Sequence, residues 1–342
     1  MRAGKYVALL SGDHPELGLG ELRAVLEVLG VKGEPELLCE RLASFEAPEE
    51  TARKAATRCA FVKEVIGLAV AVGPELIGSS VEVDPSALEG IGEPYAVRAV
   101  KLGGAEGPSR VEIERWAASA VERARPGLRV DLKSPRTVFR VYVTERLVTG
   151  GPVVGIRDGS GLSRRAPVNR PFRLPSTLQP KEARVMVNLT RTPPGSRLLD
   201  PFSGTGAILM EAASLSYDAV GIEVRTWIAR GSLRNLKAFG LSGGSDVIAG
   251  DSTSLPLRGG VGGVATDPPY GKSTRVIGPS LADLVDRVLS ELAELLEKGR
   301  RIVVAYPLGR RAPAILEGPM VVERYTYRVH SSLIRTINVL RV

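Results

Sequence analysis

The sequence predicts an α/β protein whose C-terminal half is a doubly wound, mostly parallel sheet and whose N-terminal half is a mixed α+β region. The prediction for the C-terminal half depends on the alternation of apolar runs, expected to be strands, with stretches of helical periodicity. Apolar runs at 197–200, 218–223, 246–251, 263–267 and 301–306 are separated by stretches with helical periodicity at 207–215, 226–239 and 281–296. Strands that alternate with helices form a parallel sheet covered by helices on both faces.

After residue 307 the pattern changes to two runs of alternating polar and apolar residues, 321–329 and 333–342. Such alternation is typical of antiparallel strands with one buried face. We therefore expect a hairpin at the edge of the sheet. With it the sheet has seven strands and a Rossmann-like architecture.

The N-terminal part is less regular. We expect strands at 6–10, 95–100 and 138–143, helices at 16–29, 48–63 and 109–124, and a turn at 149–151. This mixture predicts small α+β units over residues 1–153. Residues 154–175 are rich in Gly, Arg and Pro and are expected to form a linker, so the doubly wound domain would occupy residues 176–342.

The composition excludes some classes of protein. No uninterrupted apolar run in the 342 residues reaches the roughly 20 residues that cross a bilayer. The N-terminus lacks the apolar stretch of a signal peptide, so we expect a cytoplasmic protein. The two cysteines, Cys39 and Cys59, and the two histidines, His14 and His330, lack the spacing of metal ligands, and no metal site is predicted.

Positive charge is concentrated in one segment. The net charge is +8, and residues 129–191 contain thirteen Lys or Arg against four Asp or Glu, which accounts for all of it. A basic stripe beside a ligand-binding edge is typical of a nucleic-acid partner, although a solvated basic face gives the same pattern. Amides are scarce, with one Gln and four Asn, which favours a thermophile, although high genomic GC content would also explain the excess of Arg over Lys.

Acidic residues close four successive strands: Asp200, Glu223, Asp251 and Asp267. Ligands of doubly wound folds bind at the carboxyl ends of the strands, where these acids would gather. The first acid opens the loop Asp200-Pro-Phe-Ser-Gly-Thr-Gly206, whose glycines let the backbone approach a ligand closely. The third glycine of the dinucleotide motif is replaced by Leu209, which argues against a nicotinamide cofactor.

The acids also indicate the chemistry of the ligand. Glu223 is placed to accept from the ribose hydroxyls of a nucleoside, Asp251 is placed to accept from an adenine amino group, and Asp200 would lie near a methionine ammonium. A phosphate-bearing ligand would prefer fewer acids and a basic loop. S-adenosylmethionine has no phosphate and carries net positive charge, so it is the cofactor that this edge predicts. Ordinary acidic caps at the strand ends are the alternative.

The fourth strand is followed by Asp267-Pro-Pro-Tyr270. The amino group of guanine or adenine is a poor nucleophile because its lone pair is delocalised into the ring. The Asp267 carboxylate and the Pro268 carbonyl can accept its hydrogens, the prolines fix the backbone, and Tyr270 can stack on the base. The tetrapeptide therefore predicts in-line methyl transfer to an amino nitrogen. A proline-rich turn with a packed tyrosine is the alternative.

These motifs resemble those of the amino-methyltransferases, and other segments narrow the resemblance. Arg170-Pro-Phe, Pro175-Ser-Thr-Leu and Val187-Asn-Leu are similar to the segment before the catalytic core of THUMP-containing tRNA guanine-N2 methyltransferases. Residues 130–142 resemble the end of a THUMP domain, and residues 329–335 resemble the closing strand of that family. Within the family the resemblance is closest to the archaeal enzymes that methylate or dimethylate guanosine-10.

The resemblance implies a ferredoxin-like and THUMP region that binds tRNA, and a catalytic domain that transfers methyl groups from S-adenosylmethionine to N2 of a guanosine. The expected catalytic residues are Asp267, Pro268, Pro269 and Tyr270. The expected cofactor-binding residues are Ser176, Thr177, Asp200, Phe202, Ser203, Gly204, Thr205, Gly206, Glu223, Val224, Asp251 and Ser252. The expected RNA-binding residues are Arg164, Arg165, Arg170, Arg173, Lys181, Arg184, Arg328, His330 and Arg335.

Alternatives stay open. The same tetrapeptide would serve an N2-guanine methyltransferase for another tRNA position or for rRNA, or a DNA adenine N6-methyltransferase, although the THUMP-like segment argues against rRNA and DNA. A further alternative is an RNA-binding protein with a vestigial domain. We expect a monomer, and the sequence leaves open a small activating subunit and the choice between one methyl group and two. Trp116 and Trp227 are expected in the core.

Overall fold

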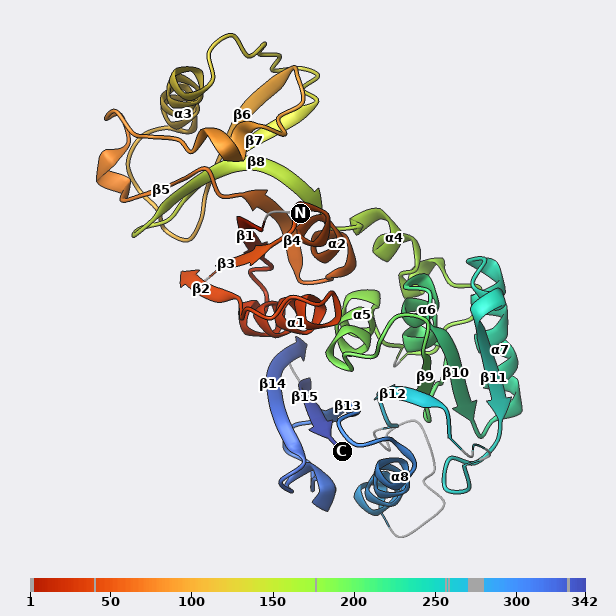
Figure 1. Ribbon diagram of the computed structural model, residues 1–342. Helices are drawn as coiled ribbons and strands as arrows, with labels where there is room; N and C mark the ends of the chain where they lie inside the picture. Colours follow the sequence, from red (N-terminus) through yellow and green to blue (C-terminus); the bar gives the residue numbers. More distant parts are fainter. Residues whose placement is uncertain are drawn as a thin grey trace. The chain divides into compact units, whose positions relative to one another are not determined.

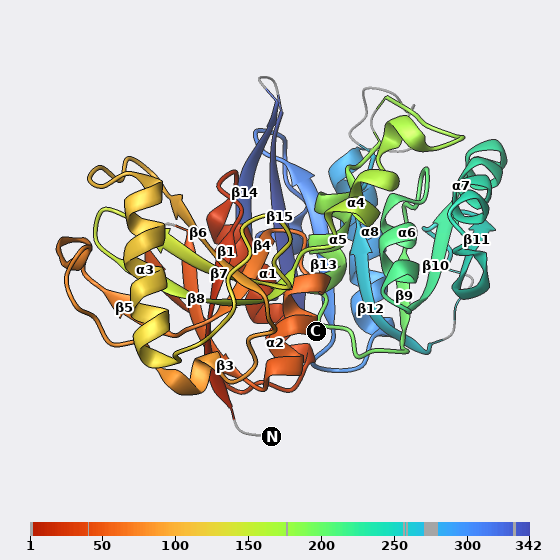
Figure 2. The same ribbon diagram turned by 90° about the horizontal axis from the view of Figure 1, so that it is seen from above.

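The computed structural model describes residues 3–39, 41–175, 177–255, 257, 259–269, 280–330 and 333–342. The chain divides into two compact units, Met1–Arg157 and Asp158–Val342. Each unit has its own sheet with helices packed against it (Figure 1 and Figure 2). None of the described helices is long and apolar enough to cross a membrane.

The first unit is an α+β unit with strand order β2-β3-β1-β4-β8-β7-β6, and β5 pairs with β8. Its strands are β1 (Gly4–Leu10), β2 (Glu36–Cys39), β3 (Leu42–Ala47), β4 (Val62–Gly67), β5 (Val70–Val72), β6 (Tyr95–Lys101), β7 (Thr137–Val143) and β8 (Val148–Ile156). Its helices are α1 (Pro15–Val28), α2 (Glu49–Arg58) and α3 (Arg110–Ala124).

Two apolar clusters hold the first unit together. One joins α1 and α2 to β1, β3 and β4, and it contains the buried thiol-bearing side chain of Cys59. The other joins α3 to β6 and β7 around Trp116, which is buried as expected and donates its indole N–H to the Ser79 carbonyl. A capping box between Ser109 and Glu112 begins α3. The sequence-based helix at 109–124 is therefore confirmed.

Two local predictions in this unit were wrong. The helix expected over 48–63 ends at Arg58, because the chain turns at Cys59 and enters β4. The turn expected at 149–151 is part of β8, and the reversal lies at residues 144–147 instead. Gly150 and Gly151 are needed for close packing: a Cβ on Gly151 would lie 1.6 Å from the Gly67 carbonyl oxygen.

The second unit is a seven-stranded sheet with the order β11-β10-β9-β12-β13-β15-β14. Its strands are β9 (Arg197–Asp200), β10 (Asp218–Glu223), β11 (Ser245–Ala249), β12 (Val261–Thr266), β13 (Arg301–Pro307), β14 (Val321–His330) and β15 (Leu333–Arg341). Its helices are α4 (Gly159–Arg164), α5 (Pro180–Leu189), α6 (Ala207–Ser214), α7 (Thr226–Ala238) and α8 (Leu281–Leu295).

The sheet of the second unit is parallel from β11 to β13 and is closed by the antiparallel hairpin of β14 and β15. Helix α8 packs its apolar side on one face of the sheet, and α5, α6 and α7 lie on the other (Figure 1). The Rossmann-like architecture predicted from alternation, edge hairpin included, is therefore confirmed.

The chain order of the strands reverses beside β9. From β9 the chain moves to β10 and β11 on one side, and β12 pairs with β9 on the other. This is the topological switch point of the sheet. At such a point the two connections diverge and leave a crevice at the carboxyl ends of the central strands.

The boundary between the units differs from the expected linker. Strand β8 continues to Ile156, and residues 158–175 belong to the second unit. They contain α4, a 3₁₀ turn at Pro167–Asn169 and the buried side chains of Leu162, Arg165 and Arg170. Gly, Arg and Pro are frequent there because the segment packs a series of turns around buried guanidinium groups.

The close approach of β8 to β4 predicts a strong effect of Gly151→Ala. The added methyl group would overlap backbone atoms of Gly67, which no side-chain movement relieves. We expect a loss of about 3 kcal/mol or more of unfolding free energy, at the upper end of overpacking effects. Urea denaturation followed by circular dichroism measures it. The control is Gly33→Ala, where the methyl group meets no atom within 4 Å; equal midpoints for the two variants would contradict the prediction.

Candidate active site

The carboxyl edge of the sheet at the switch point carries acids. Asp200 is the last residue of β9, and Asp267 follows β12, the neighbouring strand. Glu223 ends β10 on the other side of β9. Three of the four predicted strand-end acids are thus brought to one edge by the strand pairing. Asp251 lies two residues after β11, which pairs with β10.

Asp200 is buried and held in place from two directions. Its Oδ1 accepts a hydrogen bond of 2.7 Å from the Thr266 hydroxyl and one of 3.1 Å from the Phe202 amide. Burial, the largest effect, raises the pKa of Asp200 to about 7; the hydrogen bonds from Thr266 and Phe202 oppose the rise, and the charges of Asp267 and Glu223 add to it. Asp200 therefore titrates near neutral pH, which is unusual for an aspartate.

The loop after Asp200 turns tightly into α6. Gly204 and Gly206 have φ values of +49° and +80°, a region that favours glycine, and Gly206 is the N-cap residue of the helix. A Cβ on Gly206 would lie 2.3 Å from the Ser232 hydroxyl. Ser203 donates from both its amide and its hydroxyl to the Ile222 carbonyl on β10. The loop is thus fastened to the neighbouring strand.

The predicted cofactor-binding residues after β10 and β11 differ in exposure. Glu223 is half-buried, and one of its carboxylate oxygens accepts from the Arg225 amide at 2.9 Å. Val224 is exposed beside it. Asp251 is exposed and accepts from the Thr253 amide. Ser252 is buried and donates to the Pro201 carbonyl, which ties this loop to the glycine-containing loop.

Thr177 comes to the same place from the segment before α5. Its hydroxyl donates to the Leu174 carbonyl and lies 3.5 Å from the Thr205 hydroxyl in the glycine-containing loop. Phe202 is half-buried against the apolar cluster of α8. Ser176, the other residue predicted from this segment, lies outside the described residues.

The predicted acceptor-binding residues follow β12. Asp267 is half-buried, Pro268 is buried and Pro269 is half-buried. Tyr270 lies outside the described residues. One Asp267 carboxylate oxygen is 3.4 Å from the Arg335 guanidinium. The same guanidinium contacts Glu182 in the first turn of α5 and Tyr327 on β14, two residues that the sequence did not single out.

Glu182 was missed in the sequence analysis, and its signal is the burial of the helix that carries it. Helix α5 is otherwise almost wholly buried, from Pro180 and Ala183 to Leu189, so a carboxylate within it needs a cation. The strand register gives the corresponding signal for Tyr327, which pairs directly with Arg335. Both signals require knowledge of which elements are buried or paired.

Three arginines expected to contact RNA are buried instead. Arg165 donates two hydrogen bonds to Glu211, at 2.7 and 3.1 Å, and Arg184 binds the same carboxylate at 2.7 Å. Arg170 is buried and donates to the Arg165 carbonyl. Burial lowers the pKa of Arg170 to about 10. Their burial does not support the RNA contact predicted for these three residues, and they are left out of the proposal for RNA binding below.

The other RNA-binding candidates divide by exposure. Arg164, Arg173 and Arg328 are exposed, and Lys181 is half-buried. Arg335 is 5% exposed and pairs with Asp267, so its burial does not support the predicted phosphate contact either. The side chain of His330 lies outside the described part of the chain.

Trp227 was expected in the core and is 55% exposed. It lies in the first turn of α7, just after the exposed Val224, and meets the Phe172 ring edge-on with centroids 5.8 Å apart. Asn235 holds the Phe172 backbone from α7 by accepting from its amide and donating to its carbonyl. The apolar surface beside Glu223 is therefore built on a fixed support.

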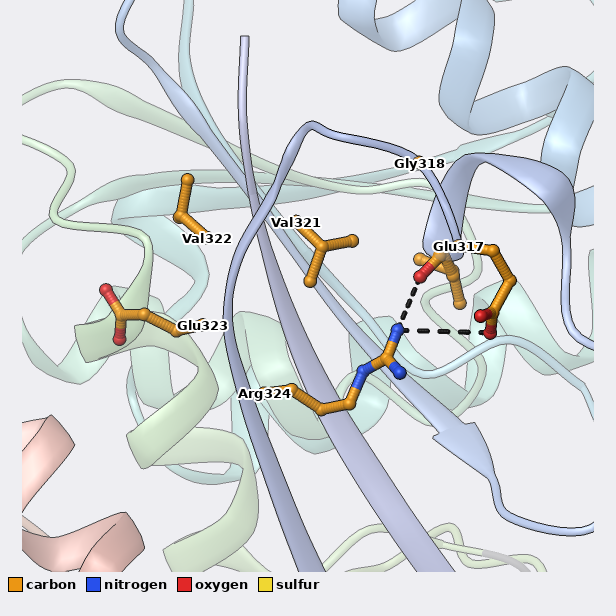
Figure 3. Close-up of a pocket in the computed structure, with 7 residues that line it drawn as sticks. Glu317, Gly318, Val321, Val322, Glu323 and Arg324 are labelled. Atoms are coloured by element: carbon orange, nitrogen blue, oxygen red, sulfur yellow. Dashed lines mark hydrogen bonds and ion pairs between the residues drawn. The ribbon is translucent and has the colours of Figure 1, made fainter.

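A shallow pocket lies at the opposite end of the sheet. It has a volume of about 390 Å³ and lies between the 3₁₀ turn before β14 and the start of β14. Figure 3 shows Arg324 pointing toward Glu317, whereas Glu323 is directed away. Arg324 also donates to the Leu316 carbonyl, and Glu323 pairs with Arg191. Because Val321 pairs with Leu340 at the amino end of the parallel strands, this pocket is separate from the acidic edge.

Comparison with known proteins identifies the family. Residues 167–337 match the family described as RMKL-like, methyltransferase domain. The tRNA (guanine(10)-N2)-dimethyltransferase of Methanothermobacter thermautotrophicus is 34% identical over 98% of this chain and 99% of its own length. The chain belongs to this methyltransferase family.

Other relatives agree with this assignment. The tRNA (guanine(10)-N2)-dimethyltransferase of Methanocaldococcus jannaschii is 27% identical to this chain. The match covers 97% of this chain and 98% of the relative's length. The crystal structure of TrmN from Thermus thermophilus has a TM-score of 0.55 and 22% identity, over 99% of this chain and all of that one. The likeness to TrmN shows that the same fold extends over both units.

The buried cluster of Arg165, Arg184 and Glu211 predicts that Glu211→Gln strongly destabilises the methyltransferase. The substitution leaves two buried guanidinium groups without their counter-charge, and we expect a loss of about 3–5 kcal/mol of unfolding free energy. Urea denaturation measures the loss, with Glu294→Gln at an exposed position of α8 as the matched control. A Glu211→Gln variant as stable as that control would contradict the structural role of the cluster.

Proposed function

We propose that the chain is an S-adenosylmethionine-dependent methyltransferase that modifies N2 of a guanosine in tRNA, at guanosine-10, forming N2-methylguanosine and then N2,N2-dimethylguanosine. The observation that carries the proposal is the pairing of β9 with β12, which brings a cofactor-type loop and an Asp-Pro-Pro motif to one crevice. Full-length relatives named for the same modification support the choice of substrate.

The residues of the crevice fit the methyl donor. Glu223 and Asp251 offer carboxylates to hydroxyl and amino groups, and the loop at Gly204 and Gly206 leaves room for a ligand beside backbone. The buried carboxyl of Asp200 adds negative charge behind the loop when it is ionised. S-adenosylmethionine, which carries an ammonium and a sulfonium but no phosphate, supplies an activated methyl group in such a site.

The acceptor side of the reaction is assigned to Asp267 and Pro268. Their carboxylate and carbonyl accept hydrogen bonds from the guanine amino group and direct its lone pair toward the methyl carbon. With S-adenosylmethionine bound, these two acceptors would hold the amino nitrogen in line with the activated methyl group, and the nitrogen would carry positive charge until it releases one proton to solvent. Negative charge at Asp267 stabilises that developing charge, because the crevice is partly shielded from water.

Exposed basic residues are proposed to guide the tRNA. Arg164, Arg173 and Arg328 are the candidates whose side chains reach solvent, and phosphate contacts of this kind position an RNA without reading its sequence. The THUMP assignment of the N-terminal region stays part of this proposal. The chain is proposed to act as a cytoplasmic monomer, since the cofactor and acceptor groups of the site come from one chain.

The first test is methyl transfer from labelled S-adenosylmethionine to unmodified tRNA transcripts. We expect wild-type protein to form N2-methylguanosine at position 10, and Asp267→Asn, which keeps the shape but loses the charge, to be slower by about a hundredfold or more. Nuclease digestion with mass spectrometry locates the product. Parallel reactions with rRNA and duplex DNA decide between tRNA and the alternative substrates; label in either of these but not in tRNA would overturn the substrate assignment.

Asp200 predicts a pH dependence of cofactor binding. Because its pKa is raised to about 7 by burial, the carboxyl takes up a proton as the pH falls below neutrality and ceases to attract a cationic ligand. The Kd for S-adenosylmethionine should rise by up to about tenfold per pH unit between pH 7 and 5. In Asp200→Asn the Kd should be higher and independent of pH. Calorimetric titration tests this, and parallel pH profiles for the two proteins would refute it.

A further inference from the structure

We propose that Arg335 is a positioning residue that holds the Asp267 carboxylate ionised and oriented for the acceptor, and that Glu182 and Tyr327 in turn hold Arg335. The inference rests on the catalytic role proposed above for Asp267. These four residues are named below as the Arg335 cluster, and all of them lie in the second unit.

The guanidinium of Arg335 is fixed from three elements. Its Nη1 is 3.1 Å from Glu182 Oε2 on α5 and 3.2 Å from the Tyr327 hydroxyl on β14. Its Nη2 is 3.4 Å from Asp267 Oδ2 after β12. One nitrogen therefore serves the two supporting groups, and the other faces the carboxylate. A guanidinium suits this task because its N–H donors lie in one rigid plane and point in different directions within it.

The sheet explains why a long cationic side chain is needed. In the order β12-β13-β15, one strand separates Asp267 from Arg335. Two strand spacings are about 10 Å, a distance that a short side chain cannot cross. Pro307, the last residue of β13, is the register partner of Arg335, so the guanidinium passes the point where β13 ends and reaches the carboxyl end of β12.

Burial makes the charges of the cluster significant. Arg335 and Tyr327 are buried, and Glu182 and Asp267 have side chains that are 15% exposed. With both carboxylates ionised, one cation lies between two anions, and the cluster retains a single negative charge for the reacting amino group. Without the cation, two carboxylates would face each other in a poorly solvated place and one of them would tend to protonate.

Four titratable or charged groups among the described residues are coupled to Asp267. They are Glu182 on α5, Asp200 on β9, Tyr327 on β14 and Arg335 on β15. Burial raises the pKa of Glu182, and Arg335 opposes that effect. Only Arg335 supplies positive charge among these four. Its loss should therefore raise the pKa of Asp267, whereas the loss of Glu182 should lower it.

The test is the pH profile of the single-turnover methyl-transfer rate at saturating tRNA and cofactor. The acidic limb of this profile is the range in which the rate falls as the pH is lowered. Arg335→Gln should move this limb to higher pH and lower the rate at pH 7 by about tenfold or more. Glu182→Gln should move the same limb to lower pH. Arg335→Lys keeps the charge, so its limb should stay close to that of the wild type with a smaller loss of rate.

The opposite directions separate positioning from a merely structural role. If the cluster only stabilised the fold, both variants would lose stability while their acidic limbs kept the wild-type position, and the proposal would be overturned. If Arg335 contacted RNA, its loss would raise the KM for tRNA and leave the rate at saturating tRNA unchanged. That result would also overturn the proposal. The double variant Arg335→Gln with Glu182→Gln keeps the single net negative charge of the wild-type cluster, so it keeps the test valid if the single variant fails to fold. Its limb should lie between those of the single variants, and an unchanged saturated rate would overturn the proposal.

Two controls accompany the series. Arg341→Gln changes an exposed arginine at the far end of the same strand and should behave as wild type. Asp267→Asn separates this inference from the proposed function. If that variant keeps full activity, the catalytic role of Asp267 and this inference both fail. If it is inactive while the limbs of the Arg335 and Glu182 variants do not move, only the inference fails.

Discussion

The pairing of β9 with β12 is the constraint on which the candidate active site depends. It places the ends of two strands side by side, and both ends carry an aspartate. One of these carboxyls, Asp200, is enclosed and held by the hydroxyl of Thr266, the last residue of β12. The hydrogen bond thus ties the strand that bears the glycine-containing loop to the strand that precedes the Asp-Pro-Pro motif.

Among the described residues of this unit, two clusters of buried charge join segments that are far apart in the sequence. Glu211 neutralises Arg165 and Arg184 below the segment that precedes α5, and this cluster fixes the path of residues 158–175. The Arg335 cluster lies at the acidic edge and connects α5 with the edge hairpin. Buried ion pairs add little net stability by themselves, but removing one partner is costly. Both clusters therefore favour one arrangement of the segments that meet there.

The edge hairpin has a second role in this arrangement. Antiparallel strands at the edge of a parallel sheet complete the core, as β14 and β15 do through Ile337, Val339 and Leu340. The start of β15 also reaches the carboxyl ends of the parallel strands, because β15 runs antiparallel to β13. The hairpin can therefore present Arg335 to the crevice while its far end lies at the amino end of the sheet.

The sequence by itself determined the architecture of the second unit and marked the sheet edge at which we propose the site. Alternating strands and helices specified the sheet, and strand-end acids such as Glu223 and Asp267 marked its carboxyl edge, because both signals are local and periodic. The first unit was predicted less well: the glycines of β8 were assigned to a turn, since their reason lies in a neighbouring strand, Gly67 of β4.

Only the tertiary structure decided which charged residues serve the fold and which face the crevice. Arg165, Arg170 and Arg184 look like surface arginines in the sequence, and Glu182 looks like an ordinary first-turn acid. Their roles follow from burial, because an enclosed charge must have a partner whereas an exposed one need not. The partners Glu211 and Arg335 are distant in the sequence from the groups they neutralise. No local pattern records such a pairing; it exists only once the sheet and its helices have packed.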